Sequence, residues 1–184
     1  MQLEIPKTKD KVNLRAIRET DEPFIWNSWL NSFRHSKAVY GQRTGYYMER
    51  QKPIIQDLLD RCSGLVITDI HDDDHLYGYV IYEQLNDKLI IHYIYLKEFA
   101  RRFGIATKLL QTLMEMHQNC GMWFSHFPPN SKIYSRLQSK FNIEYNPDLI
   151  NGERDGDRKH PGNDSRGMGT GFDQHRKNGD TNIH

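Results

Sequence analysis

The residues best suited to specific chemistry form the segment Arg101–Ala106 (RRFGIA), which joins the apolar run Lys88–Leu96 to an amphipathic run. Amides at a helix N-terminus lack partners inside the helix and meet the positive end of its dipole, so they bind phosphates well. Gly104 and Ala106 add little bulk, and Arg101 or Arg102 can add a charge-assisted contact. The segment predicts a phosphate or pyrophosphate site. A plain strand–helix junction with solvated arginines is the alternative.

The elements that must position this segment follow from apolar periodicity. We expect helices opening after Thr20-Asp21 and over residues 46–61, 104–117 and 130–137. We expect strands over 12–18, 64–69, 76–83, 88–96, 122–126 and 141–145. The strand over 88–96 is apolar on both sides, so it should be buried on both faces of a sheet. This order predicts an α+β domain, an α/β three-layer arrangement with helices on both faces of a mixed sheet.

The chain changes character near Asn146-Pro147. Residues 147–184 contain seven glycines, interleaved charges and, beyond Asn151, a single aromatic residue, Phe172. Such a segment cannot bury enough apolar surface to offset its ordering entropy. We therefore expect a domain over residues 1–146 and a polar tail over 147–184 that is disordered or ordered by a partner. A flexible terminus without a function is the alternative.

Composition narrows the possible functions. The net charge is +1, which gives no overall field for nucleic acid or an anionic membrane. No apolar stretch is long enough for a membrane span or a signal peptide, so a cytoplasmic location is expected. Cys62 and Cys120 lack metal-site spacing, and we expect them to be buried thiols. The run His71–His75 (HDDDH) fits a solvated turn better than a metal cluster. No metal is expected.

Three blocks of the chain resemble the GNAT (GCN5-related N-acetyltransferase) superfamily. Leu14–Asp21 followed by Phe24-Ile25 looks like the family's opening strand and helix. Arg101–Ala106 resembles its acyl-CoA signature, R/Q-x-x-G-x-G/A. Asn130 and Ile133–Leu137 look like its asparagine and its L-Y-x-K-L helix. The resemblance covers residues 12 to about 146. It implies a mostly antiparallel sheet, with the family's last hairpin shortened after Tyr145.

The resemblance also implies a site that binds acetyl-CoA as a cosubstrate. The family's splayed strand would place backbone groups of Tyr95 and Leu96 against the thioester and pantetheine arm. Tyr134 falls at the family's tyrosine position, so it is the candidate that protonates the departing thiolate. The remaining cofactor-binding candidates, in the signature loop and the asparagine block, are Arg101, Arg102, Phe103, Gly104, Ile105, Ala106, Thr107 and Asn130.

The general base is open at this level. Many relatives have a glutamate where this chain has Ile90. His92, two residues later and on the same face, has a suitable intrinsic pKa. Glu83 on the neighbouring strand could act through a water, and His126 at the end of the next strand is a third candidate. Each of the three could instead be purely structural.

The sequence therefore predicts an N-acyltransferase that moves an acetyl group from acetyl-CoA to an unknown amine acceptor. The alternative is a GNAT-fold structural or interaction protein without activity, for example a component of a phage virion or another assembly. The absent glutamate, the shortened sheet and the polar tail favour that alternative. In that case the tail would be the site of assembly, and the location would be a virion or the host cytoplasm.

Overall fold

The computed structural model describes residues 1–5, 11–34, 41–126 and 131–151, with the side chains of 131–133 excepted. By contacts the chain divides into Met1–Glu153 and Arg154–His184. The second unit and Asn130 lie outside the described residues. The role of the polar tail therefore stays a prediction, and the fold below is that of the first unit.

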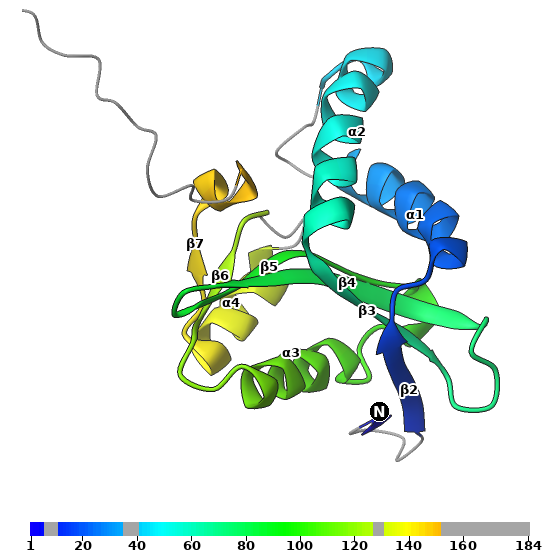
Figure 1. The fold of residues 1–184 in the computed structure, drawn as a ribbon, viewed down its shortest axis with the longest axis vertical. Coiled ribbons are helices and arrows are strands. Elements are labelled where there is room, and N and C mark those ends of the chain that lie inside the picture. The colour runs from blue at the N-terminus through cyan, green and yellow to red at the C-terminus, as the bar shows by residue number, and fades with distance from the viewer. Residues whose placement is uncertain (6–10, 35–40, 127–130, 152–184) are drawn as a thin grey trace, which may run out of the picture. The chain divides into compact units, whose positions relative to one another are not determined.

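A seven-stranded mixed sheet forms the centre of the domain (Figure 1). Its strands, in both chain and spatial order, are β1 (Gln2–Glu4), β2 (Lys11–Ala16), β3 (Ser63–Asp69), β4 (Leu76–Leu85), β5 (Lys88–Leu96), β6 (Gly121–Phe124) and β7 (Glu144–Tyr145). Pairing is antiparallel from β1 through β5 and parallel for β5–β6 and β6–β7. The expected mixed, mostly antiparallel sheet is confirmed.

Helices cover both faces of the sheet, as Figure 1 shows. The helices are α1 (Glu22–Arg34), α2 (Thr44–Arg61), α3 (Ile105–Met116) and α4 (Ser131–Phe141). On one face, α1 and α2 pack Trp29, Ile55 and Leu58 onto the sheet residues Tyr79 and Tyr93. The opposite face carries a second core, to which α3 contributes Leu109, Leu110 and Leu113 and α4 contributes Leu137. Two cores on one sheet make the three-layer architecture that the periodicity predicted.

Strand β5 is buried on both faces, as its sequence predicted. Leu89 and Ile91 belong to the α3 core, whereas Tyr93 belongs to the α1–α2 core. Ile91 pairs with Tyr82 and Tyr93 pairs with Ile81, so the intervening His92 has no partner on β4. His92 is therefore the extra residue of a β-bulge, a device that redirects side chains and often lies next to active sites.

The parallel pair β5–β6 is short. It joins Lys88–Ile91 to Gly121–Phe124, and its last hydrogen bond runs from the amide of Ser125 to the carbonyl oxygen of Ile91 at 3.2 Å. From Tyr93 to Leu96, β5 keeps its pairing with β4 but has no strand partner on the β6 side within the described residues. That edge of β5 leaves backbone groups available for a ligand.

The structure differs from the sequence-based expectation at both ends of the sheet. Gln2–Glu4 forms an edge strand on β2 that the sequence did not predict. At the other end, Pro147–Asn151 forms a 3-10 helix in which Leu149 is fully buried. A side chain of Arg61 donates a hydrogen bond to the carbonyl of Ile150 at 2.5 Å. Residues 147–151 thus pack with the domain, past the boundary expected at residue 146.

Candidate active site

The loop between β5 and α3 is held by its own hydrogen bonds. A 3-10 turn, Glu98–Ala100, follows β5, and the amide of Lys97 donates to the carbonyl of Tyr77 at 2.8 Å. The Nε of Arg101 donates to the carbonyl of Leu96 at 2.8 Å, and its guanidinium carbon lies 5.8 Å from the ring centroid of Tyr95. Arg101 therefore fixes the loop against the end of β5, where backbone groups of Tyr95 and Leu96 were expected to meet the cosubstrate.

The backbone of the signature segment makes a sharp turn into α3. Arg102 has a φ of 71° and Gly104 a φ of 92°, so two left-handed residues flank Phe103. Gly104 is also the N-cap of α3, and its carbonyl accepts the first helical bond, from the amide of Lys108 at 3.0 Å. The helix end adds its unpaired amides and its dipole.

The side chains of this segment divide by role. Ile105 is 2% exposed and anchors α3 in the core, whereas Arg101, Arg102 and Phe103 face solvent. Ala106 and Thr107 are half-buried in the first turn of α3. The arrangement leaves two guanidinium groups and the amides of the first turn facing outward. These are the groups that a pyrophosphate would contact.

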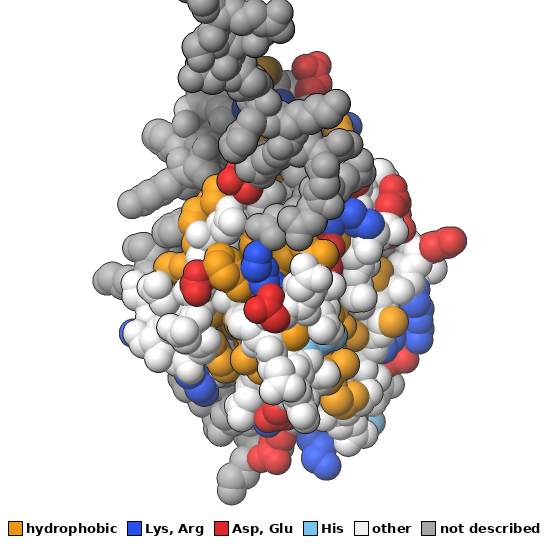
Figure 2. All heavy atoms as spheres, turned by 60° about the vertical axis from the view of Figure 1, so that its left-hand side comes forward, with side chains coloured by type: hydrophobic (Ala, Val, Ile, Leu, Met, Phe, Trp, Pro, Cys, Tyr) orange, Lys and Arg blue, Asp and Glu red, His pale blue; other side chains and the backbone are white. Residues whose placement is uncertain are grey.

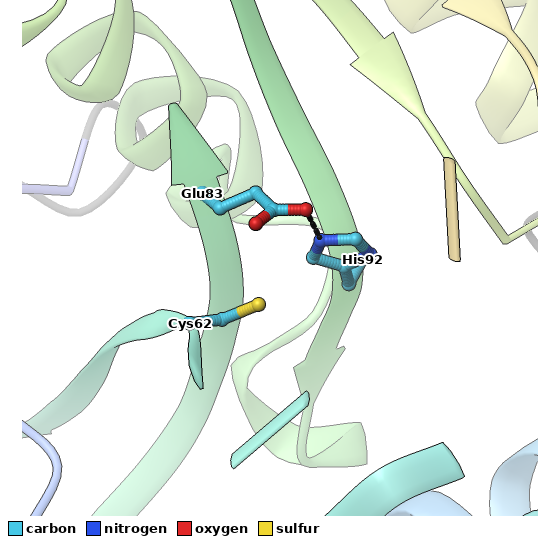
Figure 3. A group of neighbouring side chains, drawn as sticks. All are labelled: Cys62, Glu83 and His92. Carbon is cyan, nitrogen blue, oxygen red and sulfur yellow. Dashed lines mark hydrogen bonds and ion pairs between the residues drawn. The ribbon is translucent and has the colours of Figure 1, made fainter. Parts of the chain in front are cut away.

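At the divergence of β5 and β6 a chain of hydrogen bonds links three of the expected candidates. His92 Nε2 lies 3.0 Å from Glu83 Oε1, as Figure 3 shows, and His92 Nδ1 lies 2.8 Å from the Oγ of Ser125. The Oγ of Ser125 lies 3.2 Å from His126 Nδ1. The chain Glu83–His92–Ser125–His126 crosses three neighbouring strands or their ends. Three of its members were proposed separately from the sequence. Ser125 was missed, because a lone serine after a strand gives no recognisable signal.

Glu83 is held as an anion. Its second oxygen accepts a 2.7 Å bond from Arg61, which also contacts Asp57 at 2.8 Å. Burial raises the pKa of Glu83, but the hydrogen bonds from His92 and Arg61 outweigh burial and lower it from 4.5 to about 2. An ionised carboxylate can only accept hydrogen bonds. His92 therefore carries its proton on Nε2, and its Nδ1 accepts from the hydroxyl of Ser125.

The register places a carboxylate beside Ile90. Ile90, at the position where many relatives were expected to have a glutamate, pairs directly with Glu83 on β4. Residues that face each other across two strands share a face of the sheet. The carboxylate is therefore present on the same face, supplied by the neighbouring strand.

His126 ends the hydrogen-bonded chain inside an aromatic enclosure. Its ring lies 5.7 Å from Trp29, 5.2 Å from Phe33 and 6.1 Å from Tyr93, each edge-on. Burial, together with repulsion from His92 when that ring is protonated, lowers the pKa of His126 to about 4, so its ring is neutral at neutral pH. A neutral His126 donates from Nδ1 to Ser125 and does not itself serve as a strong base.

Tyr134 lies on α4, outside the four residues of the hydrogen-bonded chain Glu83–His92–Ser125–His126. The centroid of its ring lies 6.2 Å from that of Phe124 on β6. It is partly buried, and burial together with Tyr145 and Glu144 raises its pKa. A raised pKa keeps the hydroxyl protonated at neutral pH, as a proton donor requires. Asn130, the remaining predicted cofactor contact, lies outside the described residues.

The surface has no dominant sign of charge on the face in Figure 2, where basic, acidic and small apolar areas alternate. Within the described part of the chain, no helix combines the length and the apolar character that a bilayer span requires.

Both cysteines are free thiols, Cys62 half-buried and Cys120 buried. Burial and the nearby Glu83 carboxylate raise the pKa of Cys62 to about 12, so it is not a thiolate nucleophile at neutral pH.

Residues 24–133 match the model of the acetyltransferase (GNAT) family. The match spans more than half of the chain, and the chain belongs to this family. No curated protein sequence matches it.

Solved structures agree on the fold. A putative acetyl transferase from Pyrococcus furiosus superposes with a TM-score of 0.53 at 16% identity, covering 70% of this chain and 91% of that one. A possible acetyltransferase from Clostridium difficile 630 has a TM-score of 0.51 at 17% identity, with 70% and 88% covered. PaiA N-acetyltransferase from Thermoplasma acidophilum, in complex with coenzyme A, has a TM-score of 0.50 at 16% identity, with 70% and 87% covered.

Proposed function

We propose that this protein is an N-acyltransferase that moves an acetyl group from acetyl-CoA to an amine acceptor. One observation carries the proposal. The hydrogen-bonded chain Glu83–His92–Ser125 lies at the point where β5 and β6 diverge, and the same strand β5 leads to the anion-binding end of α3. A base and a phosphate site at the two ends of one open strand edge suit a thioester on a pyrophosphate-bearing arm. The coenzyme A bound to the Thermoplasma acidophilum relative supports the same cosubstrate.

Cosubstrate binding would use the backbone more than side chains. The first turn of α3, which follows the left-handed residues Arg102 and Gly104, would hold the pyrophosphate. The open edge of β5 near Tyr95 and Leu96 would accept the amides of the pantetheine arm, as a sheet edge accepts another strand. Arg101 is already bound to the carbonyl of Leu96, so its charge is positioned before the ligand arrives.

The proton of the acceptor ammonium would leave through Ser125. Its Oγ passes its hydrogen to His92 Nδ1 while it takes a proton from the amine, and His92 becomes an imidazolium between Ser125 and Glu83. Glu83, with a pKa of about 2, stays ionised and stabilises that imidazolium. His92 is thus the proposed base, Ser125 its relay and Glu83 a positioning residue.

The transfer itself needs no covalent enzyme intermediate. The freed amine attacks the thioester carbonyl, the new C–N bond forms and the C–S bond breaks. The electron pair leaves on the sulfur, which receives a proton from the hydroxyl of Tyr134, and the attacking nitrogen gives up its second proton, which restores the hydroxyl of Tyr134. The proton held by His92 returns to solvent between turnovers. Tyr134 remains our proposal for this second step, since its raised pKa suits a donor.

Two measurements test the proposal. Calorimetry with the full chain should detect acetyl-CoA at millimolar concentration or below, and CoA release should follow on addition of a panel of primary amines. His92→Gln should reduce kcat at least a hundredfold and remove the rise of the rate profile with pH, while cosubstrate affinity changes little. Ser125→Ala should reproduce that pattern more mildly. Absence of acetyl-CoA binding would refute the enzymatic proposal and leave the fold unaffected.

A further inference from the structure

A group of three side chains that includes the proposed base has the composition of a transition-metal site. The Sγ of Cys62, a carboxylate oxygen of Glu83 and a ring nitrogen of His92 all lie within 4.8 Å of one another. The three come from the end of α2, from β4 and from β5, and they point toward a common centre in Figure 3. Thiolate, imidazole and carboxylate are the three protein ligands that zinc uses most.

The distances fit a tetrahedral ion after a small movement. Zinc bond lengths place neighbouring ligands of a tetrahedral centre about 3.3–3.6 Å apart. Glu83 Oε1 and His92 Nε2 are at 3.0 Å, so an ion would separate them slightly. Only Cys62 must approach, by no more than about 1.5 Å. Cys62 is the C-cap of α2.

The surrounding contacts already orient the ligands. Once His92 Nε2 binds a metal, its proton resides on Nδ1 and is donated to the Oγ of Ser125, 2.8 Å away. Metal-binding histidines usually have such an outer partner, which fixes the ring. Arg61 holds the second oxygen of Glu83 at 2.7 Å. A thiolate and a carboxylate would neutralise a divalent ion.

One of the three ligands also lines a cavity. Cys62 borders a cavity of about 430 Å³, together with Arg18, Glu22, Leu59 and Tyr82. Three protein ligands leave one position of a tetrahedral ion for water.

We propose that Cys62, Glu83 and His92 form a Zn²⁺ site in which the ion displaces the proton on His92 Nε2 and the proton of the Cys62 thiol, both of which are released to solvent. Binding of the ion stands on this geometry alone. Its consequence rests on the proposed function: the ion occupies Glu83 and His92, so the metal-bound protein cannot relay a proton, and Zn²⁺ is a reversible inhibitor.

Cobalt(II) tests the site without any substrate. The full chain is titrated with Co²⁺ under reducing conditions, and the thiolate-to-cobalt charge-transfer absorption is followed for wild type, Cys62→Ser and Cys120→Ser. Cys120 is the matched control, because it is the second free thiol and lies away from Glu83 and His92. Wild type and Cys120→Ser should show the band with one ion per chain. Cys62→Ser should lose the band and bind at least tenfold more weakly.

Glu83→Gln protects the test against misfolding of the cysteine variant. It keeps the thiol and the side-chain shape, and it should weaken Co²⁺ at least tenfold. A thiolate band that persists in Cys62→Ser, or equal affinity in all variants, would overturn the site. Acetyl transfer is then measured with Zn²⁺ and after a chelator. Co²⁺ binding without inhibition would overturn the regulatory consequence alone, and a protein that binds Co²⁺ but transfers no acetyl group would contradict only the proposed function.

Discussion

Gly104 has a φ of 92° at the N-cap of α3, a conformation that a residue with a Cβ adopts at a cost. For alanine the left-handed conformation costs roughly 1–2 kcal/mol. A domain of this size loses about 2–4 °C of melting temperature per kcal/mol. Gly104→Ala should therefore lower Tm by about 2–8 °C, provided that the backbone keeps its shape.

If the backbone at Gly104 instead relaxes toward a negative φ in Gly104→Ala, we expect acetyl-CoA binding to weaken. Relaxation would turn the amides next to Gly104 away from a ligand at the N-terminus of α3. Each hydrogen bond to a charged group contributes about 1.5–3 kcal/mol, so the loss of one amide weakens acetyl-CoA binding at least tenfold. Calorimetry at fixed ionic strength measures this loss.

Gly41→Ala is the matched control. Gly41 has a φ of 84°, and nothing lies within 4 Å of the Cβ that alanine would add, so its cost comes from the backbone alone. Both variants should lose similar stability, whereas only Gly104→Ala should lose acetyl-CoA affinity. Wild-type affinity for acetyl-CoA in both variants would refute the pyrophosphate site at α3. An equal loss of affinity in both variants would instead indicate a general loss of stability.

Three further outcomes are expected. Tyr134→Phe should slow turnover at least tenfold with little change in acetyl-CoA affinity, because the hydroxyl acts only as the thiolate departs; a change below about threefold would assign Tyr134 to packing. Truncation after residue 151 should leave Tm unchanged, whereas truncation after residue 146 removes the buried Leu149 and should cost about 2–5 kcal/mol in urea unfolding. Asp21→Asn breaks a nearly buried pair with Arg15 and should cost about 3 kcal/mol at pH 7. Burial raises the pKa of Asp21, but hydrogen bonds from Arg15 lower it below 3.8. The difference in the free energy of unfolding between wild type and Asp21→Asn therefore has its full value above pH 3.8 and decreases as the pH falls further.

Most of the fold could be predicted because its signals are local. A run that is apolar on both sides placed β5 over Lys88–Leu96, and helical spacing from Ile105 to Leu113 placed α3 correctly. The misses lie where few residues carry the signal. Gln2–Glu4 is too short for periodicity to show, and its pairing with β2 decides its conformation. Leu149 and Ile150 are two apolar residues in a polar context. Only the burial of Leu149 and the contact of Arg61 with Ile150 show that they pack with the domain.

The sequence supplied candidate residue types for the site but not their geometry. Arg102 has a positive φ although arginine disfavours that conformation, so residue propensities could not predict it. The bulge at His92 depends on register between β4 and β5, which the sequence of either strand alone does not contain. Ser125 was missed because its role comes from the histidines on both sides of it in space. Cys62 has no motif spacing to Glu83 or His92, and only the fold groups them.

Glu83 decides between the possible bases. A carboxylate with a pKa of about 2 cannot take a proton from an ammonium at neutral pH, and it stays an acceptor toward His92 Nε2. His92 can therefore serve as the base only through Nδ1 and Ser125. A metal at the same residues requires the opposite tautomer, with Nε2 free of its proton and Nδ1 donating. One imidazole cannot hold both states at once, so a metal-bound and a proton-relaying form of this protein must exclude each other.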